Sequence, residues 1–301
     1  MTIRQIGAEV APRLDWPGLL RAMEDGHALP RAEVADTFLY RRADTLLSRA
    51  AWIDGLGQLV KTATIFPGNP ALGRPTVNGT VTLFSDATGE PAAIVDFHLV
   101  TRWKTAGDSL LSASRLARRD ARSILIVGAG TVAGSMIEAY RSLWPDAAVS
   151  VWNRSPEPAR RLARAMGATV APDLEPAVRA ADIIATCTMA TRPLIRGDWL
   201  SPGTHLDLIG AFRPDMREVD DTALTRARLF VDSRATTIHH IGELKDPIAR
   251  GVIAEGDVIA DFYDLGSGAF ARTSDDEITI AKNGGGAHLD LMTAAWIASR
   301  A

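Results

Sequence analysis

Two glycines and an alanine occur at the spacing G-x-G-x-x-A in the segment I-L-I-V-G-A-G-T-V-A-G-S-M-I-E-A-Y, residues 124–140. A short apolar run precedes the motif and a helical pattern follows it, which is the context in which such a motif binds a dinucleotide. Gly128 would permit a tight turn, Gly130 would let the backbone approach a pyrophosphate, and Ala133 would let the helix pack closely on the strand. We therefore expect Gly128, Gly130, Thr131, Val132 and Ala133 to contact a dinucleotide, with its phosphates at the helix N-terminus. The alternative is an ordinary glycine-rich turn between a strand and a helix.

The end of the next apolar strand indicates which dinucleotide is preferred. Enzymes that use NAD usually place an acidic residue there to bind the ribose hydroxyls. This chain has Asn153 instead, followed by Arg154 and Ser155. Asn153 does not repel a 2′-phosphate, Arg154 can pair with it, and Ser155 can donate a hydrogen bond to it. The pattern favours NADP(H), with NAD(H) as the second option. In the alternative interpretation Arg154 stacks on the adenine or is a solvated turn residue.

A third group of polar residues follows another apolar strand, in the segment I-A-T-C-T-M-A-T-R-P, residues 184–193. A Rossmann fold presents groups to its ligand at such a strand end, so we expect Thr186, Cys187 and Thr188 on the nicotinamide side. Cys187 is not expected to be a nucleophile, because no histidine lies in a recognisable partner motif. The six histidines, which include the pair at 239–240, lack metal-ligand neighbours, and no metal site is predicted.

A charged residue also interrupts the segment Q-L-V-K-T-A-T-I-F, residues 58–66, which is otherwise largely apolar. The charge of Lys61 needs a partner if the segment is a buried strand. Lys61 could instead be a surface lysine on a strand of alternating polarity.

Two different patterns of elements would position these residues. From residue 123 onward, short apolar strands alternate with amphipathic helices, which favours a parallel sheet covered on both faces. The first 120 residues mix the two types. They predict a helix capped by Asp15, strands at 58–66, 79–85 and 92–97, a hairpin turn between the last two strands, and a helix at 105–121. The C-terminal stretch predicts a strand, a glycine-rich turn and a helix that could pack back on the N-terminal region.

The predicted fold class is therefore α/β. A Rossmann domain would occupy residues 119–280, and residues 1–118 and 281–301 would form a discontinuous α+β domain. The 301-residue chain is 47% hydrophobic and 23% charged, which is typical of a soluble globular protein. Its net charge of −3 gives no indication of a nucleic-acid or membrane partner. The single cysteine fits a cytoplasmic protein, and the charged first sixteen residues do not predict a signal peptide.

Six motifs together resemble the ornithine cyclodeaminase/mu-crystallin family over nearly the whole chain. They are V-K-T-A-T-I-F-P-G-N (60–69), L-F-S-D-A-T-G-E-P (83–91), T-R-W-K-T-A-G-D-S-L (101–110), V-G-A-G-T-V-A (127–133), W-N-R-S (152–155) and I-G-A-F-R-P-D-M-R-E (209–218). The resemblance implies a Rossmann domain and a second α+β domain. That second domain would form a homodimer interface and bind a substrate carboxylate with basic side chains.

The resemblance implies roles for four residues of this chain. Lys61 matches the family's lysine in the motif G-x-K, and Lys104 stands where many members have arginine, which keeps the charge and loses the bidentate fork. On sequence alone Lys104 could equally be a solvated residue at a helix start. A further basic residue usually lies upstream, for which we prefer Arg49 over Arg41 and Arg42. Asp108 would either line the pocket and hold a protonated imine, or be a first-turn residue favoured by the helix dipole.

Phe212 decides between branches of the family. In the cyclodeaminases this segment reads G-A-D, and the aspartate assists deamination and ring closure, whereas a phenyl ring cannot accept a proton. The resemblance is strongest to the branch that reduces cyclic imino acids, and Phe212 would pack near the cofactor and help exclude water. Phe212 could also be a core residue with no contact to the site.

The predicted reaction is hydride transfer from NAD(P)H to the C=N carbon of a small imino acid. Δ1-Pyrroline-2-carboxylate would give L-proline, and the six-membered imine would give L-pipecolate. Three alternatives stay open at this point: an ornithine cyclodeaminase, an enzyme of the alanine dehydrogenase type acting on amino acids, and a non-catalytic protein that binds NADPH and a small ligand as mu-crystallin does.

Overall fold

The computed structural model describes residues 3–301 and divides the chain into two compact units. The first unit comprises Met1–Lys104 and Gly286–Ala301, and the second comprises Thr105–Gly285. These boundaries differ from the two that the sequence predicts. The predicted boundary at 118/119 follows helix α2 (Phe97–Leu116), and the one at 280/281 falls inside strand β14 (Thr279–Lys282). Among the described residues, no helix combines the length and the apolar character that a membrane span requires.

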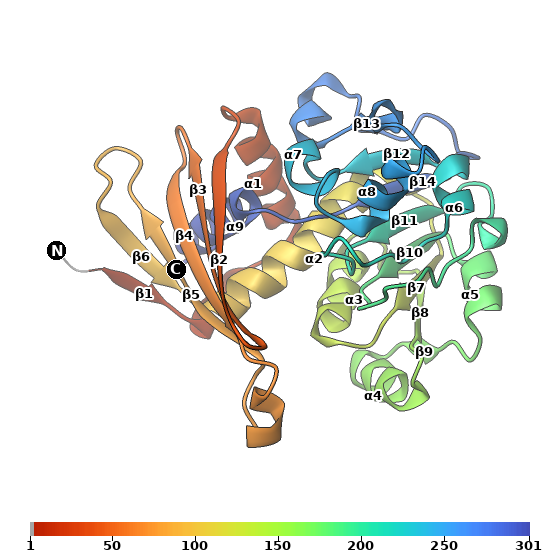
Figure 1. The fold of residues 1–301 in the computed structure, drawn as a ribbon, viewed down its shortest axis with the longest axis horizontal. Helices are drawn as coiled ribbons and strands as arrows, with labels where there is room; N and C mark the ends of the chain where they lie inside the picture. Colours follow the sequence, from red (N-terminus) through yellow and green to blue (C-terminus); the bar gives the residue numbers. More distant parts are fainter. Residues whose placement is uncertain (1–2) are drawn as a thin grey trace. The chain divides into compact units, whose positions relative to one another are not determined.

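A six-stranded sheet forms the first unit, with the strand order β1-β6-β5-β4-β3-β2 (Figure 1). All neighbouring strands are antiparallel except β1 and β6. The strands are β1 (Arg4–Ile6), β2 (Glu33–Arg41), β3 (Asp44–Ile53), β4 (Gly57–Ile65), β5 (Val77–Phe84) and β6 (Pro91–Val95). The predicted strands and the hairpin of β5 and β6 are present, and β2 and β3 were not foreseen as a hairpin of their own.

Helices cover one face of this sheet. Alternate residues of β4, Leu59, Lys61 and Ala63, are buried on that face. Helix α9 (Ala287–Ser299) packs on β3 and β4 and against α1 (Trp16–Ala28). The predicted cap of α1 is confirmed, because Asp15 accepts a hydrogen bond of 2.7 Å from the Gly18 amide. The helix-facing side of the sheet is therefore a packed interior in which any charge must be compensated.

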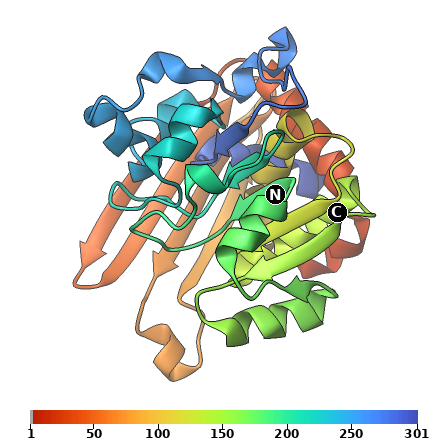
Figure 2. The same ribbon diagram turned by 90° about the vertical axis from the view of Figure 1, so that its right-hand side faces the viewer.

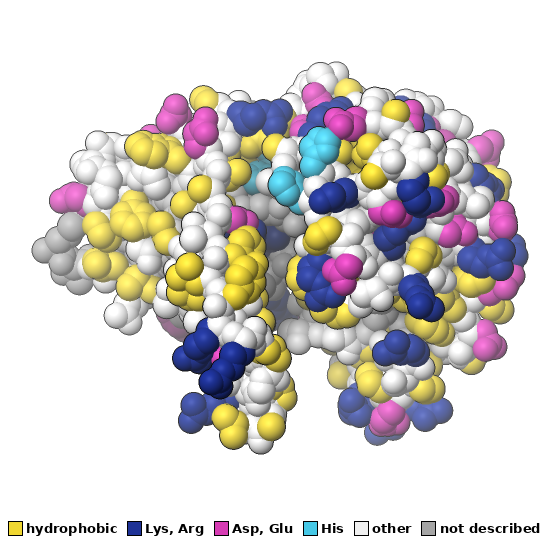
Figure 3. Space-filling model, viewed as in Figure 1, with side chains coloured by type: hydrophobic (Ala, Val, Ile, Leu, Met, Phe, Trp, Pro, Cys, Tyr) yellow, Lys and Arg dark blue, Asp and Glu magenta, His cyan; other side chains and the backbone are white. Residues whose placement is uncertain are grey.

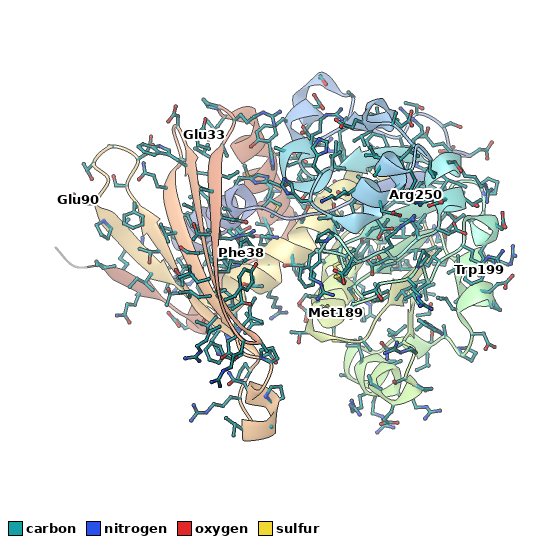
Figure 4. The ribbon with its side chains drawn as sticks, viewed as in Figure 1. Glu33, Phe38, Glu90, Met189, Trp199 and Arg250 are labelled. Atoms are coloured by element: carbon teal, nitrogen blue, oxygen red, sulfur yellow. The ribbon has the colours of Figure 1, made fainter. Side chains whose placement is uncertain are left out.

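The edge strand β2 differs from the rest of the sheet because all nine of its residues are exposed. The exposed residues include Phe38 (46% exposed) and Tyr40 (73%), which stack with ring centroids 6.1 Å apart. Figure 3 shows hydrophobic side chains at the surface over this part of the first unit, and Figure 4 labels Phe38. A strand with one unpaired edge and exposed apolar residues is a site for association with another chain.

An eight-stranded parallel sheet forms the second unit, with the order β13-β12-β14-β11-β10-β7-β8-β9. Its strands are β7 (Ser123–Val127), β8 (Ala148–Trp152), β9 (Thr169–Val170), β10 (Ile183–Thr186), β11 (His205–Leu208), β12 (Arg228–Val231), β13 (Val258–Ala260) and β14. The helices are α3 (Thr131–Leu143), α4 (Pro156–Met166), α5 (Leu174–Ala180), α6 (Asp221–Arg226), α7 (Arg234–Thr237) and α8 (Gly242–Ala249). Helices flank the strands in Figures 1 and 2, and the predicted α/β class with a Rossmann-type sheet is confirmed.

The helix predicted at 105–121 is wrong at both ends. Helix α2 begins at Phe97, because Asp96 accepts a 2.6 Å hydrogen bond from the Leu99 amide and satisfies one of the free donors of the first turn. The sequence interpretation had placed Asp96 inside a strand. The helix ends at Leu116, and beyond it Arg118 pairs with Asp182 at 2.7 Å. Lys104 therefore lies inside the helix and not at its start.

Candidate functional site

A row of charged residues crosses the helix-facing side of the first unit's sheet. In the strand register Asp36 of β2 is opposite Arg49 of β3, and Arg49 is opposite Lys61 of β4. Adjacent like charges on a sheet are destabilising, so Arg49 and Lys61 require negative charge close to them. The predicted preference for Arg49 therefore corresponds to a residue directly beside Lys61. Arg41 instead pairs with Asp44 near the hairpin turn, with 76% of its side chain exposed.

The missing negative charge comes from Asp290 in the first turn of α9. One carboxylate oxygen lies 2.7 Å from the Lys61 ammonium, and the other lies 3.5 Å from an Arg49 guanidinium nitrogen. Asp290 has no exposed surface and Lys61 is 6% exposed. Sequence reasoning missed Asp290, although the signal was the same as for Lys61: a single charge within an apolar helical stretch, A-H-L-D-L-M.

The pKa values of this pair follow from burial and the surrounding charges. Burial alone would raise the pKa of Asp290, but Lys61, Lys104 and Arg49 together hold it below its ordinary value of 3.8. Burial lowers the pKa of Lys61 from 10.5, and Asp290 opposes that shift. At neutral pH Asp290 is ionised, so the stabilisation from its charge is present above about pH 3.8 and is lost as the pH falls through the lowered pKa.

Helix α2 adds two more residues to this cluster. Thr101 accepts a 2.9 Å hydrogen bond from Lys61 through its hydroxyl oxygen. Lys104 lies one turn further along and is 9% exposed, so the alternative of a solvated helix-start residue is wrong. Thr101 and Asp290 each accept one hydrogen bond from Lys61, and the centroid of the Phe97 ring lies 4.8 Å from the ammonium nitrogen. Among the described residues, the hydrogen bonds of Lys61 therefore use two of its three N–H donors.

The guanidinium fork of Arg49 is held by Asp36. The two side chains make paired hydrogen bonds of 3.2 and 2.6 Å. Three cations, Arg49, Lys61 and Lys104, thus face two carboxylates, Asp36 and Asp290. The surplus positive charge in a mostly buried setting is what an anionic ligand would neutralise.

The glycine motif of the second unit has the geometry that the sequence predicts. Gly128 adopts φ 122°, and a side chain there would approach the Cys187 carbonyl to 2.8 Å, so only glycine fits. A side chain at Gly130 would meet no protein atom within 4 Å, which leaves the backbone open to a ligand. Ala133 is fully buried against the sheet.

The first turn of α3 is suited to a phosphate. Gly130 is its N-cap and provides no side-chain hydrogen bond, and the first turn, which contains Thr131 and Val132, carries no acidic residue. The free N–H groups and the positive end of the helix dipole therefore favour an anion. The residues present fit the pyrophosphate of a dinucleotide.

The strand end at 152–155 lies beside this turn. The Gly128 amide donates a 2.8 Å hydrogen bond to the Trp152 carbonyl, which ties the end of β8 to the glycine motif. Asn153 donates to the Ser155 carbonyl at 2.8 Å and thereby shapes the loop. Arg154 and Ser155 are exposed, and Ser155 makes no capping hydrogen bond to α4.

The residues after β10 fall into different environments. Thr186 is 1% exposed and directs its hydroxyl at the Asp207 carbonyl, whereas Thr188 lies in the loop and bonds to Glu218. Burial, and then the Glu218 charge, raises the pKa of the Cys187 thiol above its ordinary value, which suits packing against Gly128 and not nucleophilic attack.

Two predicted residues remain to be placed. Phe212 follows β11 and is 54% exposed, with the guanidinium of Arg213 5.6 Å from its ring centroid, so the core alternative is wrong. Asp108 is fully buried in the middle of α2, eleven positions after the helix begins, so the first-turn dipole alternative is also wrong.

We expect Asp290→Asn to lower the free energy of unfolding by about 3–5 kcal/mol, because it leaves the buried Lys61 and the partly buried Arg49 without their common partner. Asp36→Asn is the control. Asp36 is about one-third exposed, and losing its pair with Arg49 should cost about 0–1 kcal/mol. Urea unfolding at neutral pH measures both. Equal stability of Asp290→Asn and the wild type would contradict the role of Asp290.

Comparison with known proteins identifies the family of this chain. The sequence model of the ornithine cyclodeaminase/mu-crystallin family matches residues 54–301. A Δ1-pyrroline-2-carboxylate reductase of Paracoccus denitrificans is 53% identical over 293 residues, which are 95% of this chain and 93% of that protein. The family resemblance predicted from the six motifs is confirmed.

Solved structures share the fold. An archaeal alanine dehydrogenase dimer with bound NAD is 27% identical, has a TM-score of 0.90, and matches 100% of this chain and 96% of its own. The Δ1-pyrroline-2-carboxylate reductase of Thermococcus litoralis, in complex with NADH and L-proline, is 23% identical with a TM-score of 0.89 over 99% of this chain and 97% of its own, and supports the fold alone. This chain belongs to the ornithine cyclodeaminase/mu-crystallin family.

Proposed function

We propose that this protein is an NAD(P)H-dependent reductase of cyclic 2-imino acids, with Δ1-pyrroline-2-carboxylate as substrate and L-proline as product. The six-membered imine, which would give L-pipecolate, is a second substrate of the same class. The observation that carries the proposal is the surplus positive charge around Lys61. It accompanies 53% identity to a reductase of this name over 95% of the chain.

The substrate carboxylate is bound in this proposal by Lys61, with Arg49 and Lys104 contributing charge. Lys61 offers its third N–H, while Thr101 and Asp290 fix the direction of the ammonium. A ligand carboxylate would add a third negative group to Asp36 and Asp290 and so balance the three cations. Binding therefore depends on charge neutralisation in a low-dielectric setting, where each ionic hydrogen bond is stronger than in water.

The dinucleotide is held in this proposal by the glycine turn and α3 at its pyrophosphate, by 153–155 at the adenosine ribose, and by Thr188 on the nicotinamide side. The bound nicotinamide supplies the hydride that reduces the C=N carbon. The protein contributes orientation and electrostatics. The imine nitrogen binds already protonated, or takes its proton from water or from an acid such as Asp108.

Phe212 argues against cyclodeamination. An exposed phenyl ring has no group that accepts a proton from an amine, so the step that opens the cyclodeaminase reaction lacks its agent. Phe212 instead offers an apolar surface that can exclude water next to the cofactor. Alanine dehydrogenase activity has the weaker support, since the archaeal enzyme is 27% identical.

The direct test is an assay of four substrate conditions, in which NADPH and NADH are supplied for the three reductions and NAD⁺ and NADP⁺ for L-ornithine, because oxidation of an amine requires a hydride acceptor. Δ1-Pyrroline-2-carboxylate should be reduced rapidly. Pyruvate with ammonia or methylamine should react slowly, and L-ornithine should release no ammonia. Turnover of ornithine without imine reduction would overturn the proposal, and cofactor binding with no turnover of any substrate would favour a binding protein.

The alkaline limb of kcat/KM for the imine should report the ionisation of Lys61. Because burial lowers the pKa of Lys61 from 10.5, substrate affinity is present below that lowered pKa and falls as the pH rises through it. Lys61→Arg keeps the charge at all accessible pH values, so its limb should lie at higher pH. The substrate imine also titrates, but it does so equally with the wild type and with Lys61→Arg, so a difference between their limbs comes from residue 61. Lys245→Arg, at an exposed position of α8, is the control and should leave the limb unchanged. Identical limbs in all three proteins would exclude Lys61 as the anchor.

The preference for NADP(H) over NAD(H) rests in our proposal on Arg154. Arg154→Ala should raise the KM for NADPH by about tenfold or more and leave that for NADH within about twofold, because a charge-assisted contact to phosphate is lost. Arg179→Ala, which removes an exposed pair with Glu175 on α5, is the control. Equal losses with both cofactors would refute the 2′-phosphate contact.

We also propose that the protein is a cytoplasmic homodimer. The exposed apolar residues of β2, including Phe38 and Leu39 (61% exposed), would be covered by a second copy. The archaeal alanine dehydrogenase of the same fold is a dimer. Light scattering that gives the mass of one chain, 32.2 kDa, would contradict a homodimer.

A further inference from the structure

Glu218 is a fully buried carboxylate in the second unit that accepts four hydrogen bonds from two different loops. One oxygen accepts from the Thr188 amide at 2.9 Å and from its hydroxyl at 2.7 Å. The other accepts from the amides of Gly210 at 2.8 Å and Ala211 at 3.1 Å. The first loop follows β10 and the second follows β11, which are neighbours in the parallel sheet.

The two loops are in direct contact where Glu218 joins them. A side chain at Gly210 would come within 2.3 Å of the Thr188 amide nitrogen and 2.4 Å of the Glu218 carboxylate. Glycine is therefore required for the loops to approach closely enough to share one carboxylate. Loss of the shared acceptor would leave buried backbone donors unsatisfied on both loops at once.

The backbone of Glu218 is held in place by a second buried glutamate, Glu243. The Glu218 amide donates to Glu243 at 2.7 Å, and the Val219 amide donates to the same carboxylate at 3.1 Å. Lys282, buried at the end of β14, interacts electrostatically with both glutamates and donates to the Leu208 carbonyl at 2.6 Å. A buried charge with this many fixed partners holds a single geometry.

The same two loops expose apolar side chains. Met189 is 64% exposed and follows Thr188 directly, and it is labelled in Figure 4. Phe212 is 54% exposed and follows Ala211. Among the described residues these are the two most exposed large hydrophobic side chains of the second unit. Exposed apolar residues on two loops that a shared carboxylate joins, at the carboxyl end of a parallel sheet, suit a flat ring as ligand.

We propose that Glu218 is the positioning residue for the nicotinamide ring: its carboxylate locks the loops of Thr188 and Gly210–Phe212 into one surface against which the ring lies. This inference rests on the proposed dinucleotide site. Glu218 does not touch the cofactor and acts through Thr188 and the 210–212 backbone. The adenosine and pyrophosphate half is bound by other residues, so the effect of Glu218 is confined to one half of the cofactor.

The test compares NADH with ADP-ribose, which lacks the nicotinamide, in binding to Glu218→Gln. The Gln amide keeps one acceptor oxygen and turns its NH₂ group toward the donors of the other loop, so one carboxylate no longer accepts from both loops. The Kd for NADH should rise about tenfold, with ADP-ribose within about twofold of wild type, and kcat should fall with it. Asp232→Asn is the matched control, since Asp232 is equally buried and also accepts four hydrogen bonds, from Ser233, Thr237, Gly284 and Gly285. Asp232→Asn should lower Tm by a similar amount and leave the ratio of the Kd values for NADH and ADP-ribose unchanged.

Each outcome decides between distinct statements. If Glu218→Gln loses stability but keeps the wild-type ratio of the Kd for NADH to the Kd for ADP-ribose, the positioning role is overturned and the proposed function stands. A wild-type protein that binds neither ligand would overturn the proposed dinucleotide site itself. If Glu218→Gln does not fold, Glu243→Gln carries the test, because it loosens Glu218 from behind and should separate the ligands in the same direction. An unchanged ratio of the two Kd values in that variant would overturn the proposal.

Discussion

The first unit depends on one buried carboxylate that holds two cations in place. Register puts Arg49 and Lys61 opposite each other on neighbouring strands, where their charges repel. Asp290 reaches between them from α9, 2.7 Å from Lys61 and 3.5 Å from Arg49. The three residues come from positions that are distant in sequence, so the sheet and the C-terminal helix must both be in place before the cluster is stable. The cluster remains positively charged overall, and in the proposed function that surplus binds the anionic substrate.

In the second unit, glycines at two positions let the backbone form the turns and loop contacts of the proposed dinucleotide site. Gly128 accepts a conformation that other residues resist, and its missing side chain makes room for Cys187. Gly210 plays the corresponding part where the β10 and β11 loops meet, and Glu218 joins them with hydrogen bonds. A ligand surface made in this way is rigid before the ligand arrives, which reduces the entropy lost on binding.

Local patterns in the sequence predicted much of this. The glycine motif was predictable because strand, turn and helix are contiguous, and Lys61 stood out because a charge in an apolar strand needs a partner. The partner was not predictable, since pairing Lys61 with Asp290 depends on how α9 packs on the sheet, and register alone places Asp36 opposite Arg49. The start of α2 was missed because Asp96 directly follows a strand and its role as a cap is visible only in three dimensions. Glu218 ends the family motif at 209–218, but the motif does not show that its carboxylate joins Gly210 and Ala211 to Thr188, which follows a different strand.

The most direct test of the central claim is a crystal structure of the protein with NADP⁺ and L-proline. The account predicts the proline carboxylate about 3 Å from the Lys61 ammonium, within hydrogen-bonding distance, with the Lys61–Asp290 pair intact. A carboxylate bound away from Lys61, Arg49 and Lys104, with these side chains contacting only Asp36 and Asp290, would contradict it.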